Sequence, residues 1–329
     1  MSFTNRRRFA LAATALAFAA TGFSTSTWAD DAWPSRPIRM VVGYPAGSSP
    51  DVQARLLAEP LSRALGQPVV VENRPGASSN IGADMIAKAT DGHTIGVIGN
   101  GPLTSSKFLY AKLPYDPSTD FAPIALIGAA PLVWVTAKSP TEHTPAQTIA
   151  QLRADGDKQT YGSVGAGSGG HLGMELLKQA LGINPLHVPF NGGPAILNGI
   201  VGGHIQMTLL PASTVSPLVQ AGKLDAIAVT SAKRTPLAPT LPAMEDIGVK
   251  GLNIEVWNAV MAPATMPAAH QARLSSELSK ILLSRDMQQK LLVQGWRVDD
   301  PSAKSLKARI ASDTAVYRDI ITRNKIKID

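Results

Sequence analysis

The feature that most constrains this chain is a repeated alternation of short apolar runs with segments of helical periodicity. The run at Ile38–Val42 is followed by a pattern from Pro50 to Leu65 that places apolar residues on one helix face. The same plan returns at Tyr161–Val164 and His171–Leu181. Because helical crossovers join parallel strands, this order predicts an α/β fold with mainly parallel sheets.

The length of 329 residues favours two domains, since a single hydrophobic core stops growing at roughly 250–300 residues. Helical patterns from His270 onward follow the second α/β unit, and such terminal helices commonly return to the first domain. We therefore predict one discontinuous α/β domain from residues 30–130 plus 253–329, and a second α/β domain from residues 131–252.

Residues 1–29 are predicted to be a signal peptide. A basic start at Arg6–Arg8 precedes an Ala-rich apolar stretch, and Ala29 ends a pattern of small residues that fits cleavage. The start also fits the twin-arginine pattern, so export by that route and by general secretion both stay open. The chain has no cysteine for a lipid anchor or a disulfide. We expect a soluble periplasmic protein stabilised by its core.

The charge balance argues against a nucleic-acid partner. The formal net charge is +7, and removing the three signal-peptide arginines leaves 7 − 3 = +4 for the mature chain. The chain lacks a dense Lys/Arg stripe, so the surplus predicts weak steering of anions. None of the six histidines lies three or four residues from another, and there are no thiols. Neither a metal nor a cofactor is predicted.

Several strand-to-helix turns share a composition of small and polar residues. In a parallel sheet such turns lie at the carboxyl edge of the strands, where open α/β folds bind ligands. Each presents backbone N–H groups at a helix N-terminus, where the peptide dipoles favour an anion. A single turn of this kind commonly only caps its helix, but five across two similar halves predict an interdomain anion cleft. The turns are Ala46–Ser49, Gly76–Asn80, Gly167–Gly170, Asn191–Gly193 and Pro211–Thr214.

The sequence of the glycine-rich turn suggests two alternative functions, a dinucleotide-binding protein and a serine hydrolase. Gly165–Gly170 matches the dinucleotide pattern G-x-G-x-x-G, but no acid occurs from Leu176 to Leu224 to hold a ribose, which excludes that reading. The sequence around Ser168, AGSGG, differs by one residue from the G-x-S-x-G pattern of serine hydrolases. A secreted serine hydrolase that uses Ser168 therefore remains the alternative function. Its triad partners would be Asp225, Glu245 or Asp246, with His270.

Longer motifs resemble one family. Tyr44–Asp51 reads YPAGSSPD, and Leu65–Gly76 reads LGQPVVVENRPG. These and several shorter motifs resemble the solute receptors of tripartite tricarboxylate transporters, the Bug-type periplasmic binding proteins, over essentially the whole mature chain. The shorter motifs are Pro34–Ile38, Gly167-Ser168 with His171, Val188–Phe190 with Pro194-Ala195, and Ala221–Leu224 with Ala228–Ser231.

This resemblance implies a two-domain periplasmic-binding-protein-like, type II-like fold with crossing strands. It implies a receptor, not an enzyme, that closes over a small carboxylate such as a di- or tricarboxylate, an aromatic acid or an amino acid. It also implies a monomer that delivers this ligand to membrane permease subunits, with a sensing role as another option. The family usually has two glycines and a threonine where this chain has Ser48, Ser49 and Pro50. It also favours glycines at the positions of Ser78 and Ser79, and it often has Asp at the position of Gln206. Because serines add hydroxyls and remove space, we expect a smaller or more oxygenated ligand.

The candidate ligand-binding residues are those of the family's pocket loops together with Asn100 and His171. Asn100 follows a predicted strand, and His171 begins the helix after the glycine-rich turn. Asp51 also suits a helix cap, and His171 also suits hydrogen bonds that fix the glycine turn. Tyr44 could border the ligand, and so could Trp134 or Trp257, although aromatic residues in strands more often belong to the core. The predicted site residues are Tyr44, Gly47, Ser48, Ser49, Asp51, Ser78, Ser79, Asn80, Asn100, Ser163, Gly165, Gly167, Ser168, His171 and Asn191.

Overall fold

Nine strands carry the fold of the computed structural model, which describes residues 33–155 and 158–328; the predicted signal peptide lies outside this range. Residues from Arg36 onward form one compact unit, and the account below concerns that unit. Its strands are β1 (Ile38–Val42), β2 (Val69–Asn73), β3 (Thr94–Gly99), β4 (Phe121–Ala137), β5 (Thr160–Ser163), β6 (Leu186–Pro189), β7 (Met207–Pro211), β8 (Leu224–Val229) and β9 (Glu255–Pro263).

The helices follow the strands as the periodicity predicts. The α-helices are α2 (Ser49–Leu65), α3 (Asn80–Ala87), α4 (Asn100–Thr104), α5 (Ser106–Leu109), α6 (Pro145–Asp155), α7 (Gly169–Leu181), α8 (Gly193–Val201), α9 (Ala212–Gln220), α10 (Ala268–Leu283), α11 (Arg285–Val293) and α12 (Ala303–Arg323). Short 3₁₀ turns occur at η1 (Ala77–Ser79) and η3 (Glu245–Ile247).

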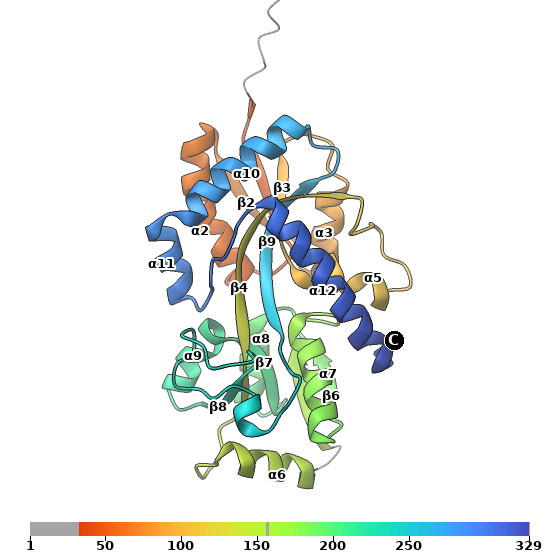
Figure 1. The fold of residues 1–329 in the computed structure, drawn as a ribbon, viewed down its shortest axis with the longest axis vertical. Helices are drawn as coiled ribbons and strands as arrows, with labels where there is room; N and C mark the ends of the chain where they lie inside the picture. The colour runs from red at the N-terminus through yellow and green to blue at the C-terminus, as the bar shows by residue number, and fades with distance from the viewer. Residues whose placement is uncertain (1–32, 156–157, 329) are drawn as a thin grey trace, which may run out of the picture. The chain divides into compact units, whose positions relative to one another are not determined.

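Parallel strand pairs form each end of the unit. Strand β1 pairs in parallel with β2 and β3, and β5 pairs in parallel with β6 and β7. We call β1–β3, with the helices α2, α3 and α10, the first lobe, and β5–β8, with α7, α8 and α9, the second lobe (Figure 1). The parallel βα units predicted from periodicity are therefore present in both lobes.

Two long strands connect the lobes. The first part of β4, Phe121–Pro131, pairs antiparallel with β9, and β9 in turn pairs with β3. The second part of β4, Leu132–Ala137, pairs with β7 and β8. Both strands therefore cross from one lobe to the other, as Figure 1 shows. This is the crossing-strand, periplasmic-binding-protein-like α/β fold that the sequence predicted.

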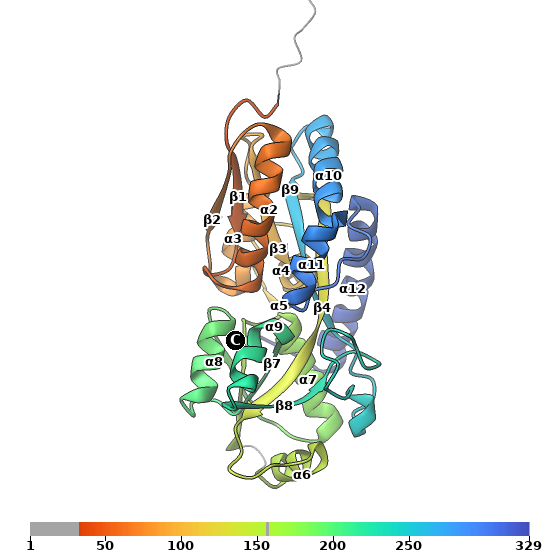
Figure 2. The ribbon, with the colours of Figure 1, turned by 90° about the vertical axis from the view of Figure 1, so that its left-hand side faces the viewer.

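The C-terminal helices lie along the crossing strands (Figure 2). Helix α10 packs on α2 and β4, and α12 packs on β4 and on α4 and α7. Leu306 near the start of α12 enters the first-lobe core with Trp257, whereas Tyr317 near its end enters the second-lobe core with Trp134. The expected core positions of Trp134 and Trp257 are confirmed. No helix in the described part of the chain is both long and apolar enough to cross a membrane.

Candidate ligand-binding site

A cavity of about 90 Å³ lies where the turns of both lobes meet the crossing strands. A single buried water needs about 10–15 Å³ of such space, so the cavity has room for on the order of six water-sized groups. This size suits a small solute. The first lobe contributes Tyr44, Gly47–Pro50, Gly99 and Asn100; the second contributes Val164, Ser168–Gly170, Gly192–Pro194, Leu209–Pro211 and Thr214; Leu132, Val256, Asn258 and Trp296 complete the lining.

The N-termini of several helices converge on this cavity. Ser49 opens α2, Gly169 and Gly170 open α7, and Gly193 opens α8, and all four residues line the cavity. The amides in the first turn of a helix have no intrahelical acceptor, and the helix dipole adds partial positive charge there. Each of these helices has nine or more residues. Their convergence favours a bound anion.

The lining itself carries no formal charge. None of the described residues that line the cavity is Asp, Glu, Lys, Arg or His. Its polar side chains are hydroxyls and amides, such as Ser168, Thr214, Asn100 and Asn258, and its walls include Leu132, Leu209, Leu210 and Val256. A ligand anion would therefore be stabilised by backbone and side-chain dipoles in a largely apolar enclosure, where such interactions are stronger than in water.

Tyr44, one of the predicted residues, forms part of the cavity wall. Burial raises the pKa of its hydroxyl to about 12. The phenol is therefore neutral at physiological pH and can donate a hydrogen bond.

The glycine turn before α7 is held by its own polar contacts. Ser168 caps the helix, because its Oγ accepts a hydrogen bond from His171 N at 3.3 Å. His171 Nδ1 accepts from Gly167 N at 3.1 Å, and Gly165 N donates to Ser163 Oγ at 3.1 Å. Ser163, Gly165, Gly167 and His171 therefore shape the turn and do not line the cavity. The turn-fixing role expected for His171 is present.

Two stacked histidines, His171 and His187, pack beside this turn. The ring centroids of His171 and His187 are 4.2 Å apart, and those of His187 and Tyr161 are 4.9 Å apart. His187 Nε2 lies 2.7 Å from Ser163 Oγ. Burial lowers the pKa of His171 to about 4, and burial together with the neighbouring His171 lowers the pKa of His187 to about 3. Both rings are therefore neutral near pH 7.

Turns from the two lobes touch each other beside the cavity. Ser105 Oγ, which follows α4, donates to Gly167 O at 2.5 Å. A Cβ added to Gly165 would lie 2.2 Å from Ser78 Oγ, so this position has no room for a side chain. Glycine at 165 thus permits the close approach of the two turns.

The first-lobe turn at residues 76–80 lies beside the cavity and not in its lining. Ala77, Ser78 and Ser79 have φ values of 46°, 55° and 74°, a left-handed conformation that side chains disfavour. Glycine, which the family resemblance led us to expect at Ser78 and Ser79, would adopt this conformation without strain. Asn80 Oδ1 accepts from Tyr115 OH at 2.6 Å, which ties α3 to the loop after α5.

Asp51 organises the turn before α2. Its carboxylate accepts from Gly47 N at 2.9 Å and from Asn73 Nδ2 at 2.9 Å, and Arg55 pairs with it at 2.9 Å. Burial on its own raises the pKa of Asp51, but the hydrogen bonds from Arg55, Gly47 and Asn73 lower it below the ordinary value. This agrees with its reading as a structural residue of the helix start.

Of the predicted binding residues, those in the lining are Tyr44, Gly47, Ser48, Ser49, Asn100 and Ser168. The others, which surround the lining or support its turns, are Asp51, Ser78, Ser79, Asn80, Ser163, Gly165, Gly167, His171 and Asn191. Asn191 is exposed in the loop between β6 and α8, whereas the next two residues, Gly192 and Gly193, face the cavity.

The geometry does not assemble a hydrolase triad around Ser168. Its Oγ caps α7, and the nearby His171 Nδ1 accepts from a backbone amide. Asp225 on β8 pairs with Lys138 at 2.7 Å, and His270 lies in α10 of the other lobe. No cluster of three metal-binding side chains occurs among the residues described.

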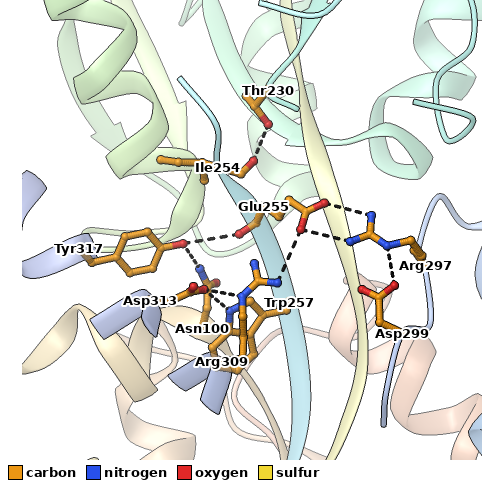
Figure 3. Close-up of polar contacts among 10 residues, drawn as sticks. All are labelled: Asn100, Thr230, Ile254, Glu255, Trp257, Arg297, Asp299, Arg309, Asp313 and Tyr317. Carbon is orange, nitrogen blue, oxygen red and sulfur yellow. Dashed lines mark hydrogen bonds and ion pairs between the residues drawn. The ribbon is translucent and has the colours of Figure 1, made fainter. Parts of the chain in front are cut away.

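A polar network that includes the cavity residue Asn100 joins the crossing strand β9 to the C-terminal segment (Figure 3). Asn100 Nδ2 donates to Tyr317 OH at 2.8 Å, so a cavity residue is held by α12. Arg297 pairs with Glu255 on β9 at 3.0 Å and with Asp299 at 2.7 Å. These two carboxylates raise the pKa of Arg297, Asp299 acting most strongly.

Sequence reasoning missed Trp296, which lines the cavity and is 2% exposed. It follows Gly295 in the segment after α11, far in sequence from every turn that was considered. The cavity residues Leu132 of β4, Leu209 and Leu210 of β7, and Val256 and Asn258 of β9 were also missed. No local pattern distinguishes them from other strand residues; only the order of the strands brings them to the site.

A two-lobed α/β unit with crossing strands and helix N-termini around a small cavity defines a solute-binding protein. Comparison with known proteins agrees. Residues 53–326 match the tripartite tricarboxylate transporter family receptor. Protein BugT of Bordetella pertussis is 33% identical over 281 residues, covering 84% of this chain and 86% of BugT.

Solved structures give the same result. The structure of R. palustris Rpa4515 with adipate has a TM-score of 0.86 at 30% identity, covering 90% of this chain and 100% of that one. The structure of MatC from Rhodopseudomonas palustris with bound malate has a TM-score of 0.82 at 27% identity, covering 88% and 100%. The chain belongs to the receptor family of tripartite tricarboxylate transporters, Bug-type periplasmic binding proteins that bind solutes and are not enzymes.

Proposed function

We propose that this chain is a periplasmic receptor that binds a small carboxylate in the cavity and delivers it to the permease subunits of a tripartite tricarboxylate transporter. The convergence of the N-termini of α2, α7 and α8 on an uncharged cavity carries the proposal. Relatives solved with adipate and with malate support the class of ligand. We propose that the receptor acts as a monomer, as its family resemblance implies.

In this proposal the two lobes act as domains 30–130 plus 253–329 and 131–252, which close on the ligand about β4 and β9. Residues 1–29 direct export and are then removed. The ligand carboxylate accepts hydrogen bonds from the amides of Ser49, Gly169, Gly170 and Gly193, while Tyr44 and Asn100 contact the rest of the ligand. The other predicted residues, such as His171 and Ser163, hold these turns in place.

A thermal-shift screen tests the proposal. The mature chain would be heated with adipate, succinate, L-malate, benzoate and L-glutamate, and with adipamide as an uncharged control. A ligand at 100 times its Kd stabilises the native state by about 2.7 kcal/mol. For domains of this size the melting temperature should rise by roughly 5–10 °C. Stabilisation by at least one acid and not by adipamide supports the receptor; no shift with any acid contradicts it.

Delivery needs its own experiment. Deleting the gene for this chain should abolish uptake of the binding acid by cells that retain the permease genes, and the wild-type gene should restore it. Unchanged uptake in the deletion strain, together with acid binding in vitro, would favour a sensing role over transport.

A further inference from the structure

Asn258 of β9 is a polar residue of the cavity lining whose two amide atoms have different surroundings. Its side chain is buried, and its Nδ2 donates a hydrogen bond to Gln53 Oε1 at 2.8 Å. A carboxamide carries a donating nitrogen on one branch and an accepting oxygen on the other. The hydrogen bond to Gln53 therefore orients the group and leaves Oδ1 as its free atom.

The free oxygen of Asn258 is open to the cavity. Oδ1 accepts no hydrogen bond from the part of the chain that the structure describes. Gln53 Nε2 also lacks a partner, but that atom is fully enclosed, whereas Asn258 Oδ1 keeps accessible surface. Because Asn258 lines the cavity, this surface belongs to the cavity. An acceptor without a protein donor therefore faces the bound solute.

A glycine on the neighbouring strand brings a second polar atom to the same place. Gly99 of β3 pairs directly with Asn258, and directly paired residues point to the same face of a sheet. A Cβ added to Gly99 would lie 3.3 Å from Asn258 Oδ1 and 2.7 Å from Tyr44 OH. All three residues line the cavity. Asn258 Oδ1 and the Tyr44 hydroxyl therefore lie close to one point of its wall.

A hydroxyl group suits these two atoms. The Asn258 oxygen can only accept a hydrogen bond, whereas the Tyr44 hydroxyl can donate one. A ligand hydroxyl both donates and accepts, so it can pair with both atoms. An ammonium group could also donate, but the described lining holds no Asp or Glu to balance its charge, and a buried unpaired charge is costly. A ligand without a donor at this place would leave the oxygen unpaired.

The acceptor lies near the proposed position of the carboxylate. Gln53, which orients Asn258, follows Ser49 by four residues on α2. Residues at this spacing lie on the same face of a helix, with their Cβ atoms about 5–6 Å apart. The amide of Ser49 opens α2 and binds the carboxylate in the proposed function. A hydroxyl that reaches Asn258 is therefore expected on a carbon close to the carboxylate, as in a 2-hydroxy acid.

We propose that Asn258 Oδ1, held in place by Gln53, accepts a hydrogen bond from a hydroxyl group of the bound acid, so that the receptor selects 2-hydroxy carboxylates. Asn258 is then a specificity-determining residue, and Gln53 is a positioning residue that acts through it. This inference rests on the proposed carboxylate-receptor function and adds the substituent that the cavity recognises.

Matched acids test the proposal by isothermal titration calorimetry. Four carbon skeletons are used, namely propionate, succinate, glutarate and phenylacetate. Each is compared as the plain acid and with a hydroxyl, an ammonium or an oxo group at carbon 2. For glutarate the substituted acids are 2-hydroxyglutarate, glutamate and 2-oxoglutarate, with both enantiomers where they exist. Within each series only the substituent changes, so the ratio of affinities reports the group that the cavity recognises.

Matched variants locate the effect. Asn258→Leu keeps a side chain of similar size and removes the acceptor, and Gln53→Met removes the group that orients the amide. Asn198→Leu is the control, because it makes the same substitution at an exposed position of α8 outside the cavity lining. Circular dichroism and urea unfolding verify that each variant folds.

Wild type and Asn198→Leu should bind a 2-hydroxy acid roughly 3- to 10-fold more tightly than the plain acid of the same skeleton, the range for one neutral hydrogen bond. The amino acid and the oxo acid should bind more weakly than the hydroxy acid. Asn258→Leu should remove the preference. Gln53→Met should reduce it, because the Asn258 amide can then turn either branch towards the ligand.

A folded Asn258→Leu or Gln53→Met variant with the full wild-type preference would overturn the inference. Tighter binding of the plain or the amino acid by wild type would also overturn it, and so would tighter binding of the oxo acid, because Asn258 would then present Nδ2 to the ligand. If the thermal-shift screen identifies a bound acid but wild type prefers no 2-hydroxy acid, the inference fails and the receptor function stands. If no acid binds in either experiment, both fail.

Discussion

The stacked histidines of the second lobe should make the protein lose stability as the pH falls from about 7 to about 5. His171 accepts a hydrogen bond from Gly167 N, and His187 packs on it with ring centroids 4.2 Å apart. Burial lowers the pKa of His171 to about 4 and that of His187 to about 3. In the unfolded chain both should titrate near an ordinary pKa of about 6.5.

The sign follows from the protons bound by each state. Between the folded and unfolded pKa values the unfolded chain binds protons that the folded chain excludes, so the free energy of unfolding decreases as the pH falls. At about pH 5 His171 should contribute a loss of about 2 kcal/mol, and the half-buried His187 a smaller one because water reaches its ring. The expected total is about 3 kcal/mol. The paired carboxylates, such as Asp51 and Glu72, have lowered pKa values and act at lower pH.

Urea unfolding followed by circular dichroism at about pH 7, 6 and 5 measures this loss. His187→Phe keeps an aromatic ring in the stack but cannot titrate, so its stability should fall less over the same range. A free energy of unfolding that is the same at both ends of this range would refute the reasoning. So would a His187→Phe variant with the full wild-type pH dependence.

Three further substitutions have definite expected outcomes. Ser49→Pro removes the backbone N–H at the first position of α2, a position that tolerates proline. Calorimetry should show about 10-fold weaker acid binding than for the control variant Ser49→Ala. Equal affinities of the two variants would contradict the role of this amide. Ser79→Gly relieves a residue at φ 74° and should raise the free energy of unfolding in urea by on the order of 1 kcal/mol; a decrease would show that the serine side chain outweighs the backbone strain. Tyr317→Phe removes the hydroxyl that accepts from Asn100, so it should lower stability by about 1 kcal/mol and weaken acid binding several-fold, whereas unchanged affinity would separate this network from the ligand.

Much of the fold could be predicted because its signals are local. The apolar run at Ile38–Val42 and the helix that follows read directly from periodicity, and Gly66 ends that helix with φ 74°, as its position suggested. The glycine and serine turns likewise predicted that helix N-termini would face a ligand. The structure places Ser48, Ser49 and Ser168 in the cavity lining.

The rest of the site depends on tertiary topology. Leu209, Val256 and Asn258 sit in strands whose local pattern indicates only burial, and the pairing of β4 with β7 and β9 brings them together. Trp296 reaches the cavity because Arg297 pairs with Ala129, a contact between positions far apart in the chain. The serines of the 76–80 turn are not in the lining, and Ser78 Oγ instead accepts a hydrogen bond from Tyr110 OH at 3.1 Å.

A crystal structure of the mature chain with the acid that stabilises it most would test the central claim directly. We predict that the carboxylate lies inside the cavity, with its oxygens within about 3 Å of amides that open α2 and α7, at Ser49, Gly169 or Gly170. An acid bound elsewhere on the protein, or bound in the cavity with its carboxylate away from every helix N-terminus, would contradict the account.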